Sequence, residues 1–154
     1  MINNDVLRRL RYALDLNDAA MIEVFALGAA TVSPDELTAL LLKEEQDGFV
    51  ELDDERLDAF LDGLITSRRG KREGPTPEKE LPVRLTNNAI LRKLKIALNF
   101  KEDQMIEVFQ LADFRISRGE LSAFFRQRGH KNYRDCGDQA VRNFLVGLVK
   151  QLRG

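Results

Sequence analysis

The sequence predicts an all-α protein made of two tandem four-helix repeats with approximate two-fold symmetry. Residues 3–70 and 87–154 align without a gap at a constant offset of 84, and about a third of the paired residues are identical. Apolar residues in both repeats recur at the three- and four-residue spacing of a helix. A serine followed three residues later by glutamate, a pattern that begins many helices, occurs at matched places. One helical unit is therefore predicted to occur twice.

A charged, proline-rich segment separates the two repeats. Three of the four prolines of the 154-residue chain lie in residues 71–86, a composition typical of an extended, solvated linker. The predicted domains are thus a first repeat at residues 1–70 and a second at residues 87–154. A unit of about 70 residues buries only a marginal core. We therefore expect the two repeats to pack on each other.

The first two helices of a repeat are predicted from their apolar patterns. The first is expected at about residues 5–14, with Asn3 and Asn4 supplying acceptors for the free N–H groups of its first turn. The second is expected at about residues 18–28 and contains Met-Ile-Glu-Val-Phe at residues 21–25, which the second repeat reproduces whole. Because this helix is apolar nearly all round, we expect it at or near the contact between repeats.

The third and fourth helices have clearer boundaries. Ser33 and Glu36 form the capping box that begins the third helix, and the fourth is expected to start near residue 53. Gly63 lies inside this fourth helix, as does Gly147 in the second repeat. Glycine at such a position costs about 1 kcal/mol relative to alanine. Its presence in both repeats predicts that another helix passes close by.

Bulk composition narrows the class of protein. Hydrophobic residues make up 44% and charged residues 32% of the chain, and no apolar run reaches the length of a membrane span. The first residues lack the basic and apolar regions of a signal peptide, and the single cysteine cannot form an internal disulfide. We therefore expect a cytoplasmic protein with no membrane partner.

The net charge of −1 conceals a division along the chain. Residues 1–70 contain 15 Asp and Glu against 7 Lys and Arg, a balance of −8, whereas residues 71–154 contain 10 against 17, a balance of +7. An anionic partner is therefore expected to contact the second repeat only.

The segment most similar to an active site is residues 129–138, which contains the only histidine and the only cysteine. His130 and Cys136 could in principle form an activated thiolate or part of a zinc site. In the first repeat the equivalent positions hold Gln46 and Leu52, which favours a packing role for Cys136. One His and one Cys are also too few for a closed zinc site. We therefore expect no catalytic residue, no metal, no cofactor and no enzymatic activity.

Glu23 is a charged residue in an otherwise apolar helix, and it is retained as Glu107. A catalytic carboxylate would need a second carboxylate or a base beside it, and none recurs at fixed spacing. Structural ion pairs of Glu23 with Arg8 and of Glu107 with Arg92 are the favoured interpretation.

The third helix differs most between the repeats. It follows the second helix in an arrangement that loosely resembles a helix-turn-helix. A helical wheel places several arginines of the second repeat on one side with Ser122, where the first repeat has uncharged residues such as Thr38 and Leu42. The candidate face for nucleic acid or an acidic partner comprises Arg115, Arg118, Arg126, Lys131 and Arg134. Thr38 and Leu42 define a candidate protein-contact patch. Free drift of surface charge would produce the same difference, so both interpretations stay open.

Two classes of function are compatible with these patterns. The favoured one is a non-enzymatic protein-interaction module or adaptor with a protein partner. The alternative is a nucleic-acid-binding regulator that uses the basic second repeat. Self-association also stays open, because the acidic half can compete for the same cations within one molecule or head-to-tail between two.

The repeated motifs resemble the YehS-like family of bacterial proteins, which contain two copies of a domain of unknown function. The resemblance is carried by residues 3–9 (NNDVLRR), 21–25 (MIEVF), 33–37 (SPDEL), 60–64 (FLDGL), 129–134 (GHKNYR) and 143–145 (NFL). It covers nearly the whole chain outside the linker. The resemblance implies the tandem architecture and assigns no catalytic or cofactor-binding residue.

Overall fold

A computed structural model describes residues 1–71, 74, 78–79 and 81–154, and these residues form eight α-helices and no strand. The all-α prediction is confirmed. The first repeat contains α1 (Asn3–Ala13), α2 (Asp18–Leu27), α3 (Pro34–Leu41) and α4 (Asp54–Arg69). The second contains α5 (Asn87–Leu98), α6 (Glu102–Leu111), α7 (Arg118–Phe124) and α8 (Asp138–Arg153). Part of the predicted linker, residues 72–73, 75–77 and 80, lies outside the described residues.

Within each repeat the second helix crosses the fourth at very short range. A Cβ atom on Gly63 would lie 1.8 Å from the Val24 carbonyl oxygen, and one on Gly28 would lie 1.7 Å from the Ala59 oxygen. The second repeat has the same crossing, where a Cβ on Gly147 would lie 1.9 Å from a backbone oxygen of α6. The predicted close approach at the retained glycines is confirmed.

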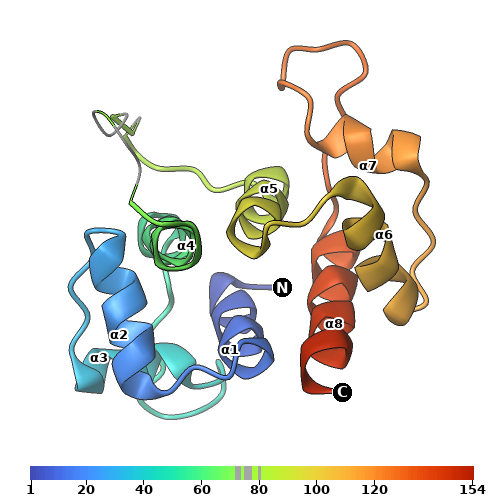
Figure 1. Ribbon diagram of the computed structural model, residues 1–154. Coiled ribbons are helices and arrows are strands. Elements are labelled where there is room, and N and C mark those ends of the chain that lie inside the picture. Colours follow the sequence, from blue (N-terminus) through green and yellow to red (C-terminus); the bar gives the residue numbers. More distant parts are fainter. Residues whose placement is uncertain (72–73, 75–77, 80) are drawn as a thin grey trace.

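The two repeats pack on each other through their first and fourth helices. Helix α4 contacts α5 and helix α8 contacts α1, so the two junctions are related by the approximate two-fold axis. Figure 1 shows α2 and α3 on one side of the molecule and α6 and α7 on the opposite side, with the other four helices between them. The predicted packing of the repeats is confirmed, but the expectation that the second helices form the contact is wrong.

The orientation of α2 explains this difference. Its large side chains Met21, Val24 and Phe25 are buried, and Phe25 packs against Phe60 of α4 with ring centroids 5.0 Å apart. The residues of α2 that stay exposed include Glu23, two alanines and Leu27 at the end of the helix, which is 43% exposed. One buried face is therefore enough for α2, although its sequence is apolar nearly all round.

Two aspartates tie the repeats together at equivalent places. Asp54 accepts hydrogen bonds from Asn3 Nδ2 at 2.8 Å, within its own repeat, and from the Leu85 backbone N–H at 3.0 Å, just before α5. Asp138 accepts from Asn87 Nδ2 at 2.8 Å and from the amino terminus of the chain at 3.5 Å. The hydrogen bond from Asn87 and the positive amino terminus lower the pKa of Asp138. Asp54 thus joins α1 to the segment before α5, and Asp138 joins α5 to the segment before α1.

The second asparagine of each pair clamps the loop between the third and fourth helices. Asn4 is fully buried, and its Nδ2 donates to the Leu40 and Val50 carbonyls at 2.9 Å each. Its Oδ1 accepts from the Leu52 N–H at 2.9 Å. Asn88 makes the equivalent three bonds in the second repeat. A buried amide needs partners for all its polar atoms, and here the loop backbone supplies them.

The asparagines do not cap the first helices, contrary to the prediction. Ile2 is the N-cap residue of α1, and Asn3 and Asn4 lie inside the helix. In the second repeat Thr86 caps α5, and its hydroxyl accepts from the Ala89 N–H at 3.1 Å. The side chains of the asparagines point instead to the loop and to α4.

An ion cluster reinforces one of the two junctions. Asp58 and Asp62 of α4 both pair with Lys93 of α5, and the Asp62–Lys93 distance is 2.7 Å. The same two aspartates pair with Lys79, at 2.8 Å for Asp58 and 2.9 Å for Asp62. Burial alone would raise the pKa of Asp58, but the hydrogen bonds and positive charges of the two lysines outweigh it and lower the pKa. At the other junction Arg142 occupies the position of Asp58. Acidic residues of the first repeat are thus partly neutralised by lysines that follow it.

Every helix among the described residues is too short or too polar to cross a membrane.

A candidate anion-binding surface on the second repeat

The loop that joins the third and fourth helices has the same backbone framework in both repeats. In the second repeat the His130 N–H donates to the Gln127 carbonyl at 2.9 Å, and the Arg134 N–H donates to the Ala123 carbonyl at 3.2 Å. The first repeat contains the equivalent bonds, from Gln46 to Lys43 at 3.0 Å and from Val50 to Ala39 at 3.3 Å. The asparagine clamps hold both loops to the helices beneath. The two loops therefore share these backbone hydrogen bonds, although Gly48 has a φ of +90° and its counterpart Asn132 has no positive φ.

The charge of this loop is inverted between the repeats. Residues 42–51, here named the acidic loop, contain one cation and four anions, a balance of −3. Residues 126–135, here named the basic loop, contain four cations and one anion, a balance of +3. All of these charged side chains are exposed. The acidic residues are Glu44, Glu45, Asp47 and Glu51, and the basic residues are Arg126, Arg128, Lys131 and Arg134. The same framework therefore displays opposite charges in the two repeats.

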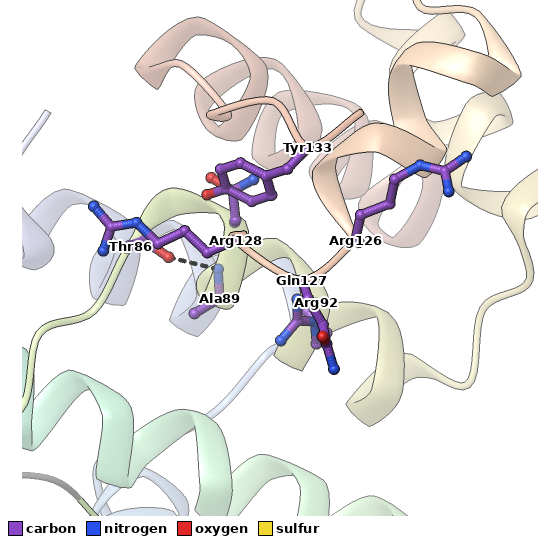
Figure 2. A pocket seen from close by; sticks show the side chains of 8 residues that line it. Thr86, Ala89, Arg92, Arg126, Gln127, Arg128 and Tyr133 are labelled. Carbon is purple, nitrogen blue, oxygen red and sulfur yellow. Dashed lines mark hydrogen bonds between the residues drawn. The ribbon is translucent and has the colours of Figure 1, made fainter. Parts of the chain in front are cut away.

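The basic loop borders an open hollow above α5, with a volume of about 300 Å³. Arg92 of α5, Arg126, Arg128 and Tyr133 contribute to its lining. Figure 2 shows Arg126 and Arg128 extending from the loop in opposite directions. The guanidinium groups therefore do not converge on one point. This arrangement suits an extended anionic partner better than a single small anion.

Arg92 lacks the partner that its counterpart has. In the first repeat Arg8 pairs with Asp5 and donates from Nη1 to the Leu42 carbonyl at 2.9 Å. At the position of Asp5 the second repeat has Ala89, and no carboxylate in the described part of the chain pairs with Arg92, which is exposed. Arg92 is therefore available to an external carboxylate or phosphate.

The pairing of Arg8 with Asp5 also corrects a prediction. Glu23 and Glu107 are exposed, and neither forms an ion pair with any described residue. The expected pairs of Glu23 with Arg8 and of Glu107 with Arg92 are wrong. Asp5 is a nearer partner for Arg8 because it lies three residues earlier on the same helix.

The predicted cationic residues fall into two groups. Arg126, Lys131 and Arg134 lie on the basic loop. Arg118 is the first residue of α7 and pairs with Asp103, and Arg115 lies in the segment before that helix. The expected common helical face is wrong, because α7 spans only Arg118–Phe124. Arg115 precedes this helix and Arg126 follows it.

The same side of α7 is also partly covered. The Ser122 hydroxyl donates to Glu102 Oε1 of α6 at 3.0 Å and is half-buried. A side chain that contacts a neighbouring helix cannot be part of an open face for a recognition helix.

A family model described as a protein of unknown function, DUF1456, matches residues 3–70 and, a second time, residues 87–154. The chain belongs to this family. It is also 40% identical over 149 residues to the uncharacterized protein YehS of Escherichia coli (strain K12), with 97% of this chain and 95% of that protein covered. No solved structure matches the chain. The resemblance inferred from the repeated motifs is therefore confirmed.

Two arginines of this DUF1456 protein were absent from the sequence-based candidate set. Arg92 and Arg128 contribute to the hollow, but the retained residues predict an internal ion pair for Arg92, and the helical wheel of the third helix does not include Arg128. Both could have been found by comparing the repeats, since Ala89 replaces Asp5 and Arg128 replaces Glu44. The informative signal was the loss of an acidic residue as much as the gain of a basic one.

The candidate protein-contact patch of the first DUF1456 unit lies at the end of α3. Thr38 is exposed, and its hydroxyl donates to the Pro34 carbonyl at 3.0 Å. Leu42 is half-buried and is the C-cap residue of α3, with its carbonyl bound to Arg8. A protein contact at these two residues stays a prediction.

The histidine and the cysteine of the second DUF1456 unit lie in different environments. Cys136 is buried in the core, and burial, helped by the charge of Asp138, raises the pKa of its thiol to about 12. His130 is exposed, and its Nδ1 accepts from the Asn132 N–H at 3.0 Å. The predicted packing role of Cys136 is confirmed. The described residues contain no cluster of three or more His, Cys, Asp or Glu that could hold a metal ion.

Proposed function

We propose that the protein is a non-enzymatic interaction module that binds an acidic protein segment through its second repeat. The binding surface comprises Arg92, Arg126, Arg128, Lys131 and Arg134, here named the cationic surface. The observation that supports the proposal is the inversion of charge on two loops with the same backbone framework. Two loops that display opposite charge attract different partners.

The shape of the cationic surface favours a protein segment. Its guanidinium groups diverge (Figure 2), so they can pair with carboxylates spaced along an extended or looped chain. An interface of this kind gains specificity and association rate from complementary charge.

Nucleic acid is the second candidate, supported by the balance of +7 after residue 70. Three observations favour protein over nucleic acid. The cations do not lie on one helical face, and the residues that line the hollow include a single aromatic for base stacking, Tyr133, which is half-buried. The first repeat, with a balance of −8, repels a long polyanion.

Binding of a fluorescent Glu-rich peptide to the full-length protein at low salt tests the proposal. The variant Arg92→Gln, Arg126→Gln, Arg128→Gln is expected to bind between about three-fold and about 100-fold more weakly, since each of three exposed ion pairs contributes roughly 0.2–1 kcal/mol. The matched control is Arg115→Gln, Arg118→Gln, which removes exposed cations at the start of α7 and should leave affinity within about two-fold.

Duplex DNA of mixed sequence serves as the competing probe. Tighter binding to DNA than to peptide, with a logarithmic salt slope of about −0.9 per phosphate contacted, would support the nucleic-acid alternative. Equal peptide affinity for both variants and the parent protein would contradict the proposal.

A further inference from the structure

We infer that the acidic segment recognised by the cationic surface belongs to a second copy of this chain. The acidic loop of one molecule binds the cationic surface of the next, in a head-to-tail arrangement. This inference rests on the proposed function and names its partner.

The first argument is the complementarity of charge. The acidic loop has a balance of −3 and the basic loop a balance of +3 over the same ten positions. Glu44 is replaced by Arg128 and Asp47 by Lys131. Opposite charge at equivalent places provides matched groups for several ion pairs between the two loops.

The second argument is that the charged side chains of both loops are exposed and form no ion pair with the part of the chain that the structure describes. Ion pairs among the described residues include none made by Glu44, Glu45, Asp47 or Glu51, and none made by the basic residues of the cationic surface. The acid–base complementarity that the fold does use lies elsewhere, in the cluster of Asp58 and Asp62 with two lysines. The loop charges are therefore left for an external contact.

The third argument is the position of the loops. In Figure 1 the loop between α3 and α4 lies at the lower end of the molecule and the loop between α7 and α8 at the upper end. One molecule cannot bring its own two loops together. A contact between two molecules leaves one acidic loop and one cationic surface unused, so association continues into rings or chains.

Arg92 supplies the fourth argument. Its counterpart Arg8 already binds the carboxylate of Asp5, which shows the kind of group this position accepts. Because Ala89 replaces that aspartate, Arg92 can receive a carboxylate from the acidic loop of the next molecule.

Two complementary variants of the full chain test this inference by analytical ultracentrifugation. The first is Glu44→Gln, Glu45→Gln, Asp47→Asn, which removes the acidic loop's charge. The second is Arg92→Gln, Arg126→Gln, Arg128→Gln, which weakens the cationic surface. The matched control changes Arg115→Gln and Arg118→Gln. All of these residues are exposed, and circular dichroism and thermal unfolding verify that each variant is folded.

The parent protein is expected to increase in average mass with concentration at about 20 mM salt and to return to monomer at about 0.5 M salt, where exposed charges are screened. Each variant alone should stay monomeric, and the control should associate like the parent. An equimolar mixture of the two variants should stop at a heterodimer, because only one acidic loop and one cationic surface remain functional.

A parent protein that stays monomeric at low salt would overturn the inference, as would association that both variants leave unchanged. A mixture that forms no heterodimer would also overturn it. If the monomeric parent still bound the Glu-rich peptide through the cationic surface, the proposed function would stand and only this inference would fail. If the parent protein neither self-associated nor bound the peptide, both the proposed function and this inference would be overturned.

Discussion

The buried side chains of Asn4 and Asn88 set the geometry of the two charged loops. Each one satisfies two backbone carbonyls and one backbone N–H across the loop. A buried amide that loses any of these partners incurs a desolvation cost, so the loop conformation is fixed while its outward residues are free to change. Because Asn4 and Asn88 hold the two loops by the same hydrogen bonds, the loops can carry opposite charges without changing how they are attached.

Cys136 gives a prediction at the scale of one residue. Its pKa of about 12 keeps the thiol protonated at neutral pH, and a protonated, buried thiol is a poor nucleophile. The native protein should therefore resist alkylation by iodoacetamide at pH 7.5, whereas the protein unfolded in guanidinium should react completely. Intact-mass measurement detects the added group. Rapid alkylation of the native protein would contradict this view of Cys136.

Aligning the two repeats predicted a residue's role correctly where the role depends on that residue's own polarity. Leu52 at the equivalent position was sufficient to predict the packing role of Cys136. The same alignment gave a wrong ion-pair partner for Glu23, because an ion pair depends on which side of its helix faces the neighbouring elements. Asp5 binds Arg8, and Glu23 lies on the exposed side of α2.

At the scale of elements, the crossing of α2 and α4 depends on the absence of side chains. A Cβ on Gly63 would collide with a backbone oxygen at 1.8 Å, and the backbone of a packed helix cannot move aside cheaply. Gly63→Ala is therefore expected to lower the free energy of unfolding by at least about 2 kcal/mol, although alanine favours helix formation by about 1 kcal/mol. Urea unfolding measures the change.

Gly119 provides the matched control. It lies inside α7, where an added Cβ would come no closer than 3.9 Å to a neighbouring atom. Gly119→Ala should raise the free energy of unfolding by about 0.5–1 kcal/mol, because only the helix preference changes. Equal effects of the two substitutions would show that the crossing is not as tight as the structure indicates.

The same crossing shows what periodicity could and could not predict. A glycine retained inside the fourth helix correctly predicted a close neighbour. The apolar character of α2 did not identify that neighbour, because a helical wheel does not distinguish exposed apolar residues such as Leu27 from buried ones such as Met21. Met21, Val24 and Phe25 are retained for contacts inside their own repeat.

At the scale of the whole molecule, the ion cluster makes one junction sensitive to pH. The lowered pKa of Asp58 means that its contribution to stability is present above the ordinary Asp pKa of about 4 and is lost as the pH falls through the lower folded-state value. Lys79 is affected oppositely: burial alone would lower its pKa, but the hydrogen bonds that it donates to Asp58 and Asp62, together with their negative charges, raise it. Its contribution is therefore present below the ordinary Lys pKa and is lost as the pH rises through the raised value.

Asp58→Asn tests this junction. The substitution leaves two lysines with one carboxylate, and we expect the free energy of unfolding at pH 7 to fall by about 1–3 kcal/mol. The variant should also lose less stability than the parent between pH 5 and pH 2, a range of about three units around the Asp pKa. The control Glu55→Gln, an exposed position on the same helix, should change stability by about 0.5 kcal/mol or less. An unchanged acid profile for Asp58→Asn would contradict the assignment.

The charge division between the halves was predictable from composition, but which of these charges pair with each other inside the fold was not. The sequence has −8 and +7 as two totals, and only the packing of α4 on α5 shows that Lys93 neutralises part of the acidic side. Charges of −3 and +3 lie on the two loops, whose shared backbone hydrogen bonds no helical pattern could reveal.

The reciprocal junctions have a consequence for how such a molecule can diverge. In a symmetric dimer of a single repeat, every substitution would occur twice, so Arg at the position of Asp58 would place cations at both junctions. Covalent joining removes that constraint, and the chain holds Asp58 at one junction and Arg142 at the other. The symmetric scaffold has thereby acquired a direction: one end of the molecule is chemically distinguishable from the other, which no dimer of identical halves can achieve.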